Sequence, residues 1–349
     1  MFARKHCMAF EGKDERTRNV RVEDVAREAG VSPITVSRAL STPEIVKPET
    51  RERVLRAVEK TGYVVNTLAS SLRSGRSSFI AMFVSNIENP HFARATRGCA
   101  DALENSGFHL MMAQTNYSAR LEADFVGSVL PLRPAALIFT GVVQAPTTKT
   151  LIRSRGMAVM EMWDHVEDPL DMLVGFSNLD GGRLMGEHFG RAGFRNIAYV
   201  GRTQDRGAQR LAGFREGLAA TGAELGHVAP LDGHPPVIAD GAQALRTVMQ
   251  RYPQVDAIFF SSDVLAVGAS LEAARDDATS HVAFAGYGDS GLAEALPVPL
   301  TTVHVSSYEM GFRAGKMLLR RLAGESVRER SIVLPNELRI RQSTARFIN

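Results

Sequence analysis

The pattern of apolar and polar positions first becomes periodic at residue 22. Apolar residues within 22–29 recur at i, i+3, i+4 and i+7, which places them on one face of a helix that a glycine then ends. Ser32 can cap a second helix that has Pro33 at its first position, and a third helix is predicted from Pro48 to just before Gly62. The residues expected to form the core of this three-helix unit are Val22, Val25, Ala26, Ala29, Val36, Ala39, Leu40, Val54, Leu55 and Val58.

After Ser78 the pattern changes to short apolar runs that alternate with helical segments, the first of them predicted from Pro90 to about Asn105. The runs are FIAMFV (79–84), HLMMA (109–113), AALIF (135–139), MAVMEM (157–162), NIAYVG (196–201), AIFF (257–260) and VAFAGY (282–287). They are too short for long helices and too continuous for strands with one exposed face, which is typical of buried parallel strands. We therefore predict a doubly wound α/β body, in two lobes because of its length, with ligands bound between them.

Between these two units, residues 66–78 form the Ser-rich stretch NTLASSLRSGRSS. Leu68, Ala69 and Leu72 have helical spacing, but the stretch has no second apolar face. Such a segment cannot bury enough surface to order itself, so we expect a linker that becomes helical only with DNA or a partner. Residues 1–19 are expected to form a disordered tail.

Composition narrows the class of protein. The chain has 349 residues, 44% hydrophobic and 23% charged, which is ordinary for a protein that buries a sizeable core. No apolar run approaches the roughly 18 residues of a membrane span, and the N-terminus lacks a signal-like apolar stretch, so we expect a cytoplasmic protein. The two cysteines, Cys7 and Cys99, have no zinc or redox spacing, and no metal or cofactor is predicted.

Charge is distributed unevenly along the chain. Residues 1–78 hold fifteen Lys or Arg and ten Asp or Glu, whereas the remainder holds 26 basic and 28 acidic residues. A basic head therefore precedes a nearly neutral body. Charge alone fits an ordinary solvated face as well as it fits a nucleic-acid surface, so the distinction rests on motifs.

The stretch VRVEDVAREAGVSPITVSRAL (20–40) resembles the helix-turn-helix of the lactose-repressor family of bacterial transcription regulators. PETRERVLRAVEKTGYVVN, ENPHF, FSNLDGGRL, RLAGF, SSDVLAVG, GYGDS and PLTTV follow in the family's order, so the resemblance extends over about residues 20–345. It implies a helix-turn-helix domain (20–65), a hinge helix (66–78) and a two-lobed core (79–346) like periplasmic sugar-binding proteins. The implied N-lobe is about 79–176 and 306–333, and the implied C-lobe about 177–303 and 334–346. A homodimer or a tetramer is implied as well.

The resemblance implies a first group of functional residues that contact double-stranded operator DNA. They are Ser32, Pro33, Ile34, Thr35, Ser37, Arg38, Thr50, Ala69 and Leu72. Arg38 is expected to read guanine in the major groove, and Pro33 and Ile34 offer only apolar contacts such as thymine methyls. The hydroxyls of Ser32, Thr35 and Thr50 suit phosphate contacts or simple helix capping equally well. Leu72 is expected to wedge into the minor groove, the alternative being packing on its own core.

The second group is implied to bind a small-molecule effector. It comprises Phe92, Trp163, Asp164, Arg210, Ser262, Asp263 and Asp289. Arg210 matches the family's effector-binding arginine, and a carboxylate beside an aromatic ring, as at Asp164 and Trp163, suits a sugar. Gly288 stands where many sugar-binding members carry an aspartate, and Asp289 follows it. For each residue the alternative is a purely structural polar group.

The stretch EMWDHVEDPLDMLVGFSN (161–178) resembles the gluconate-utilisation repressor branch of the family. A sugar acid would pair its carboxylate with Arg210, with Arg206 or Arg202 as helpers. We therefore expect a repressor of a carbohydrate or sugar-acid operon, whose operator affinity is controlled by the effector.

Two other protein classes share parts of this pattern: periplasmic-type solute carriers and NAD-dependent oxidoreductases. A carrier would need a signal peptide, which is not apparent in the sequence. Residues 286–291 read G-x-G-x-x-G after a predicted strand, but Pro297 and Pro299 follow too soon for a full crossover helix. We therefore interpret 286–291 as a loop and expect neither a nucleotide cofactor nor an enzyme.

Overall fold

The computed structural model describes residues 20–64, 77–233, 235–275, 279–345 and 347. The chain divides into two compact units, residues 1–70 and residues 71–349. The predicted tail, the linker through residue 76, Cys7, and the predicted DNA contacts Ala69 and Leu72 lie outside the described residues.

The first unit, the head, is a small helical bundle. Its elements are α1 (Val22–Ala29), α2 (Pro33–Ser41), the 3-10 turn η1 (Pro43–Ile45) and α3 (Pro48–Thr61). Val25, Val36 and Val54, one from each α-helix, are fully buried at its centre. The expectation that Leu55 faces the core is wrong, because Leu55 is 45% exposed and Ala57, one turn after Val54, is buried instead.

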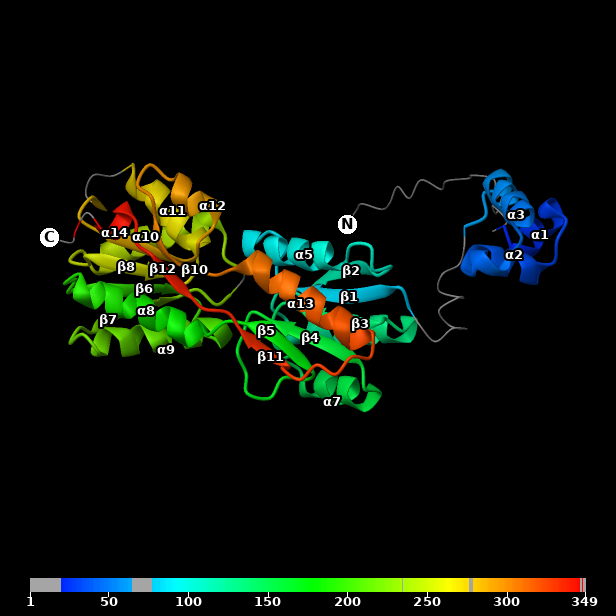
Figure 1. Cartoon of the computed structure of the whole chain (residues 1–349). Helices are drawn as coiled ribbons and strands as arrows, with labels where there is room; N and C mark the ends of the chain where they lie inside the picture. The colour runs from blue at the N-terminus through cyan, green and yellow to red at the C-terminus, as the bar shows by residue number, and fades with distance from the viewer. Residues whose placement is uncertain (1–19, 65–76, 234, 276–278, 346, 348–349) are drawn as a thin grey trace, which may run out of the picture. The chain divides into compact units, whose positions relative to one another are not determined.

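The second unit contains two lobes, each built on a six-stranded sheet (Figure 1). The N-lobe sheet has the order β11-β5-β4-β3-β1-β2, and all its strand pairs are parallel. Its strands are β1 (Phe79–Val84), β2 (His109–Gln114), β3 (Ala136–Phe139), β4 (Ala158–Met162), β5 (Met172–Gly175) and β11 (Ser331–Val333). Its helices are α5 (Pro90–Leu103), α6 (Ala119–Val129), η2 (Leu130–Leu132), α7 (Pro146–Arg155) and α13 (Ser307–Leu322).

The C-lobe sheet has the order β12-β10-β9-β8-β6-β7, and only β12 is antiparallel to its neighbour. Its strands are β6 (Ile197–Gly201), β7 (Leu225–Pro230), β8 (Ala257–Phe260), β9 (Ala283–Gly288), β10 (Thr301–His304) and β12 (Glu337–Arg339). Its helices are α8 (Asn178–Arg191), α9 (Asp205–Ala219), α10 (Ile238–Arg251), α11 (Asp263–Ala273), α12 (Gly291–Ala295) and α14 (Gln342–Ala345).

Alternate residues of β1 show how the N-lobe sheet is covered on both faces. Ile80, Met82 and Val84 belong to a core cluster with residues of α5 and α13. Phe79, Ala81 and Phe83 belong to a separate cluster with residues of α6 and α7. Figure 1 shows α5 and α13 lying together on one side of this sheet. The predicted doubly wound α/β class is therefore confirmed.

Every predicted apolar run forms a strand, but one of them is not buried. β2 lies at the sheet edge, and its Met111 and Met112 are 53% and 58% exposed. Five strands, β5, β7, β10, β11 and β12, were not among the predicted runs. Four of them have only three or four residues, and β7 is a half-exposed edge strand, so neither length nor a continuous apolar run marks them.

The chain passes between the lobes after β5, after β10 and after β11, so each lobe contains discontinuous segments. The stretch 286–291 ends β9 and leads into α12, which has five residues. The expected loop therefore contains a short helix, which is still far shorter than the crossover helix of a dinucleotide site. Among the described residues, no helix is long and apolar enough to cross a membrane, and no cluster of three metal-binding side chains occurs.

Candidate functional site

The head presents one helix surface of unusual composition. Pro33, Ile34 and Arg38 are exposed on α2, on the side away from the buried Val36 and Ala39. Ile34 is 65% exposed, although it is as apolar as any core residue. An exposed apolar side chain beside an exposed arginine suits a surface that contacts both the methyl groups and the polar edges of bases.

The Ser32 hydroxyl of the head acts as a helix cap. Ser32 Oγ accepts a hydrogen bond from the Thr35 backbone N–H at 3.2 Å, and the two hydroxyl oxygens lie 2.9 Å apart. Thr50, half-buried, lies in the first turn of α3. Arg21 lacks a capping hydroxyl, and Asp24 compensates by accepting the Arg21 backbone N–H at 3.0 Å. Capping therefore accounts for Ser32 in the free head, and the Thr35 hydroxyl bonds to that cap.

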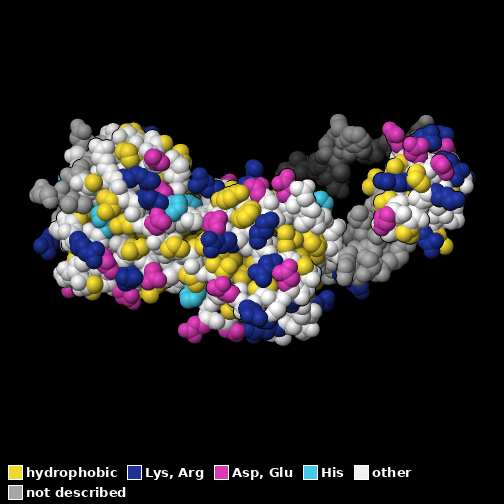
Figure 2. All heavy atoms as spheres, in the orientation of Figure 1, with side chains coloured by type: hydrophobic (Ala, Val, Ile, Leu, Met, Phe, Trp, Pro, Cys, Tyr) yellow, Lys and Arg dark blue, Asp and Glu magenta, His cyan; other side chains and the backbone are white. Residues whose placement is uncertain are grey.

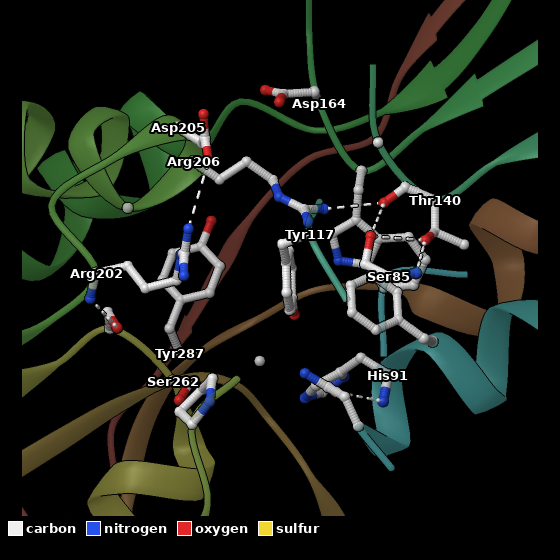
Figure 3. A pocket seen from close by; sticks show the side chains of 18 of the residues that line it. Ser85, His91, Tyr117, Thr140, Asp164, Arg202, Asp205, Arg206, Ser262 and Tyr287 are labelled. Carbon is white, nitrogen blue, oxygen red and sulfur yellow. Dashed lines mark hydrogen bonds and ion pairs between the residues drawn. The ribbon is translucent and has the colours of Figure 1, made fainter. Parts of the chain in front are cut away.

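The second unit holds a pocket of about 120 Å³ between its lobes (Figure 3). Its N-lobe side is aromatic. The Phe92 ring lies 4.5 Å from the Trp163 ring and 6.3 Å from the Tyr117 ring, measured between centroids. Asn89 caps α5 by accepting the His91 N–H at 3.0 Å, which fixes Phe92 in the first helical turn. Trp163 has a φ of 74°, an uncommon conformation for a bulky residue that places its ring against Phe92.

The C-lobe side of the pocket carries three arginines. Arg206 lies in the first turn of α9 and donates to the Thr140 carbonyl of the N-lobe at 3.2 Å (Figure 3). Arg210 is one turn later and donates to Asn178 Oδ1 at 2.8 Å and to the Ser261 carbonyl at 2.6 Å. Arg202 forms an ion pair with Asp205 at 3.4 Å.

Arg206 and Arg210 differ from Arg202 because their hydrogen-bond partners are neutral. Among the described residues, neither guanidinium has a carboxylate within the 4.0 Å of an ion pair. Burial lowers the pKa of Arg206 from its ordinary value, and Tyr117 and Asp164 oppose that shift. The Arg210 guanidinium also lies 3.9 Å from the centre of the Tyr287 ring. The pocket therefore contains positive charge that lacks a direct counter-ion.

Three buried carboxyl groups line the pocket, each raised in pKa mainly by burial. Asp164 accepts the His165 N–H at 3.2 Å and lies 3.4 Å from Asn178 Nδ2. Asp263 is fully engaged, because it accepts the Thr302 hydroxyl and the Ser290 N–H, both at 2.6 Å. Glu122 accepts the Gln144 N–H at 3.1 Å, and its pKa rises to about 7. Asp263 thus organises the pocket wall.

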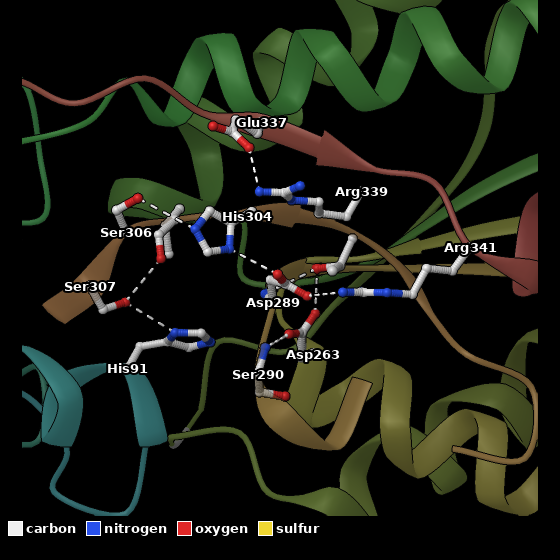
Figure 4. A network of polar contacts seen from close by, with 12 residues as sticks. His91, Asp263, Asp289, Ser290, His304, Ser306, Ser307, Glu337, Arg339 and Arg341 are labelled. Atoms are coloured by element: carbon white, nitrogen blue, oxygen red, sulfur yellow. Dashed lines mark hydrogen bonds and ion pairs between the residues drawn. The ribbon is translucent and has the colours of Figure 1, made fainter. Parts of the chain in front are cut away.

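The structure brings six of the seven predicted effector residues together around this pocket, and Asp289 is the exception. The Asp289 carboxylate accepts Arg341 Nη2 at 2.7 Å and lies 2.8 Å from His304 Nδ1 (Figure 4). Gly288 and Asp289 have φ values of 132° and 63°, so the chain turns sharply after β9. Asp289 does not line the pocket, because its carboxylate closes an ion network with Arg341 and His304, and its contact with a ligand stays a prediction.

Sequence reasoning did not name most of the lining residues, among them His91, Tyr117, Glu122 and Thr140. Tyr117 and Thr140 follow β2 and β3, where carboxyl ends of parallel strands meet, and this position was an available signal. His91 lies inside the ENPHF motif next to Phe92. Glu122 had no signal, because a charged residue in an amphipathic helix is usually on the exposed side.

The two parts of the chain match separate family models. The model described as "Bacterial regulatory proteins, lacI family" matches residues 21–66, and the model of a periplasmic binding protein-like domain matches residues 187–344. The HTH-type transcriptional regulator GntR of Pseudomonas aeruginosa is 31% identical over 97% of this chain and 100% of its own length.

Two solved structures are similar over almost the whole chain. One is a LacI-family transcriptional regulator from Silicibacter pomeroyi, with a TM-score of 0.87 and 27% identity, covering 93% of this chain and 99% of that one. The other is the lac repressor dimer bound to operator and the anti-inducer ONPF, with a TM-score of 0.78 over 94% and 99% of the two chains. Its 22% identity makes it a likeness of fold.

Proposed function

This chain belongs to the lacI family of bacterial regulatory proteins, which are DNA-binding transcriptional regulators, and we propose that it represses a sugar-acid operon under the control of an aldonate bound between its lobes. The relatives matched are transcriptional regulators and not enzymes. As a regulator of chromosomal genes, the protein would act in the cytoplasm.

The observation that carries this proposal is the pair of guanidinium groups of Arg206 and Arg210, whose hydrogen-bond partners are all neutral. A buried cation is costly unless an anion compensates it, and a carboxylate suits the planar guanidinium fork. An aldonate supplies one carboxylate and a chain of hydroxyls. A neutral sugar would leave both cations uncompensated.

The rest of the pocket suits the polyhydroxy part of such a ligand. The rings of Phe92 and Trp163 offer apolar faces to C–H groups, and the carboxyl group of Asp164 can bond to hydroxyls. Ser262 Oγ is buried and has no hydrogen-bond partner among the described residues, so a ligand hydroxyl would satisfy it. The resemblance of residues 161–178 to the gluconate branch points to the same class of ligand.

On DNA, the proposed homodimer would place each α2 helix in the major groove, with Arg38 reading guanine and Ile34 contacting thymine methyls. Effector binding would change how the two lobes close and thereby displace the hinge segment from the minor groove. The predicted contacts of Ala69 and Leu72 remain part of this proposal.

Ligand binding can be tested with the protein's own fluorophore, because Trp163 is its single tryptophan and lines the pocket. We expect D-gluconate to change the Trp163 emission with a saturable midpoint, and the uncharged polyol sorbitol to have no effect at the same concentrations. Equal responses to gluconate and sorbitol would contradict the proposed role of the arginines.

DNA binding is tested with the upstream region of the regulator's own operon in a gel shift. Arg38→Ala is expected to lower the preference for operator over random DNA by about five- to 150-fold, because a bidentate base contact provides about 1–3 kcal/mol of discrimination. Arg51→Ala, an exposed arginine on α3, serves as a matched control that leaves this preference unchanged. An unchanged preference in Arg38→Ala would remove it from the base-reading role.

A further inference from the structure

A contact between the two lobes at one end of the pocket involves His91 and Gly288. His91 lies in the first turn of α5 in the N-lobe, and Gly288 is the last residue of β9 in the C-lobe. A Cβ atom at position 288 would lie 2.2 Å from His91 Nε2, and the φ of Gly288 is 132°. The imidazole of one lobe thus fills the space that a side chain of the other lobe would occupy.

His91 is held in place by a short chain of hydrogen bonds (Figure 4). Its Nδ1 lies 3.2 Å from Ser307 Oγ, and Ser307 Oγ can donate to the Val305 carbonyl at 3.3 Å. If the Ser307 hydrogen points to Val305, then Nδ1 carries the imidazole hydrogen and Nε2 carries a lone pair. The cations Arg210 and Arg94 add to the effect of burial in lowering the pKa of His91, which favours the neutral ring.

His91 Nε2 is buried and has no hydrogen-bond partner among the described residues. Desolvation by burial lowers the pKa of His91 to about 4, so its ring is neutral at physiological pH. An unsatisfied buried acceptor destabilises the ligand-free pocket, and a hydrogen-bond donor of the ligand would offset that cost. Figure 3 shows His91 and Arg206 at different sides of the pocket, so this acceptor is separate from the proposed carboxylate site.

We propose that His91 is a specificity-determining residue whose Nε2 accepts a hydrogen bond from one hydroxyl of the bound sugar acid, at the end of the pocket that His91 and Gly288 line. The inference rests on the proposed function and adds a rule for the ligand. A neutral acceptor requires a donor opposite it, so a hydroxyl is accepted at that carbon, whereas a keto oxygen or a hydrogen atom is rejected. Because the two residues come from different lobes, the contact also favours the closed cleft.

The experiment is a double-mutant cycle between protein and ligand, read by Trp163 fluorescence. Wild type and His91→Ala are titrated with D-gluconate and with its monodeoxy derivatives, one hydroxyl removed at a time. His281→Ala, an exposed histidine that does not line the pocket, is the matched control. Ser307→Ala keeps His91 but removes the partner of Nδ1, and it tests the same role if His91→Ala folds poorly.

We expect His91→Ala to weaken gluconate binding about tenfold, and one deoxy derivative to bind wild type about tenfold more weakly, each equivalent to about 1.4 kcal/mol. Combining the two is expected to add no further loss. Ser307→Ala is expected to weaken gluconate in the same direction but less, and His281→Ala not at all.

The outcomes separate the two proposals. If wild type binds no sugar acid, the proposed function is overturned, and the role of His91 with it. If wild type binds gluconate but His91→Ala and Ser307→Ala bind it equally well, only the role of His91 is overturned. The same holds if the losses from His91→Ala and from every deoxy derivative simply multiply.

Discussion

The two lobes share one sheet topology, but they contribute different kinds of side chain to the pocket between them. Their strand orders correspond position by position, from β11-β5-β4-β3-β1-β2 to β12-β10-β9-β8-β6-β7. The N-lobe contributes the rings of Phe92, Tyr117 and Trp163, and the C-lobe contributes the guanidinium groups. The comparison teaches that the fold determines where side chains converge, at carboxyl ends of parallel strands, and that individual residues determine the chemistry.

Glu122 of the N-lobe and Arg206 of the C-lobe bring charges of opposite sign to the pocket wall. In the N-lobe, Glu122 and Glu161 accept the backbone N–H groups of Gln144 and Val143, so both carboxyl groups hold one loop of the pocket. In the C-lobe, Arg206 remains without a carboxylate partner among the described residues. On the outside, Figure 2 shows basic and acidic side chains intermixed over the visible face of the core. The charge that we propose to bind the ligand therefore lies inside the pocket.

The largest expected effect comes from removing the C-lobe charge. Arg206→Met and Arg210→Ala are each expected to weaken gluconate binding by about 2–5 kcal/mol, about thirtyfold or more, because a buried ion pair with the ligand is lost. Operator affinity without ligand should change little. Arg206→Met should also raise the melting temperature of the ligand-free protein, because an uncompensated buried cation is removed. Gluconate midpoints equal to those of wild type would remove the arginines from the site.

A smaller effect is expected from the N-lobe wall. Phe92→Leu keeps an apolar side chain but loses the flat ring, so we expect gluconate binding to weaken about three- to tenfold, corresponding to about 0.6–1.4 kcal/mol. Wild type and Phe92→Leu are titrated in parallel, with Phe312→Leu on α13, outside the pocket, as the control. A loss as large as that of Arg206→Met would contradict the expectation that the C-lobe cations contribute more to gluconate binding than the N-lobe rings do.

The N-lobe carboxylates predict a modest dependence of stability on pH. The pKa of Glu122 rises from 4.5 to about 7 in the folded protein, so the folded state binds more protons between these values. Its contribution to stability is complete below pH 4.5 and is lost as pH rises through about 7. Glu122→Gln should therefore raise the melting temperature at pH 8 by a few degrees and leave it nearly unchanged near pH 4.5. Identical shifts at both pH values would refute ionisation of Glu122 as the cause.

The smallest effect on ligand binding is expected at Asp289. Asp289→Asn should change gluconate affinity less than about twofold, because the carboxylate bonds to Arg341 and His304 outside the pocket. The melting temperature should fall, since Arg341 loses a charged partner that is mostly buried. A change in gluconate affinity without a change in stability would instead indicate that the Asp289 carboxylate contacts the ligand.

The sequence alone determined the features that depend on neighbours along the chain. The cap at Ser32, the proline that begins α2 and the apolar runs of the strands are local patterns, and the structure contains them where they were expected. The motifs also identified the family. Leu55 shows the limit of such patterns, because helical spacing alone does not say which of two adjacent apolar residues faces inward.

Only the tertiary structure decided which distant residues meet. Asp289 lies within the GYGDS motif, yet two successive residues with positive φ turn it toward Arg341. His91 and Gly288 are almost two hundred positions apart and contact each other only because the lobes close. Arg206 connects the two lobes because α9 directs its guanidinium group across the cleft to the Thr140 carbonyl. Such convergence depends on how two lobes pack, which no local pattern encodes.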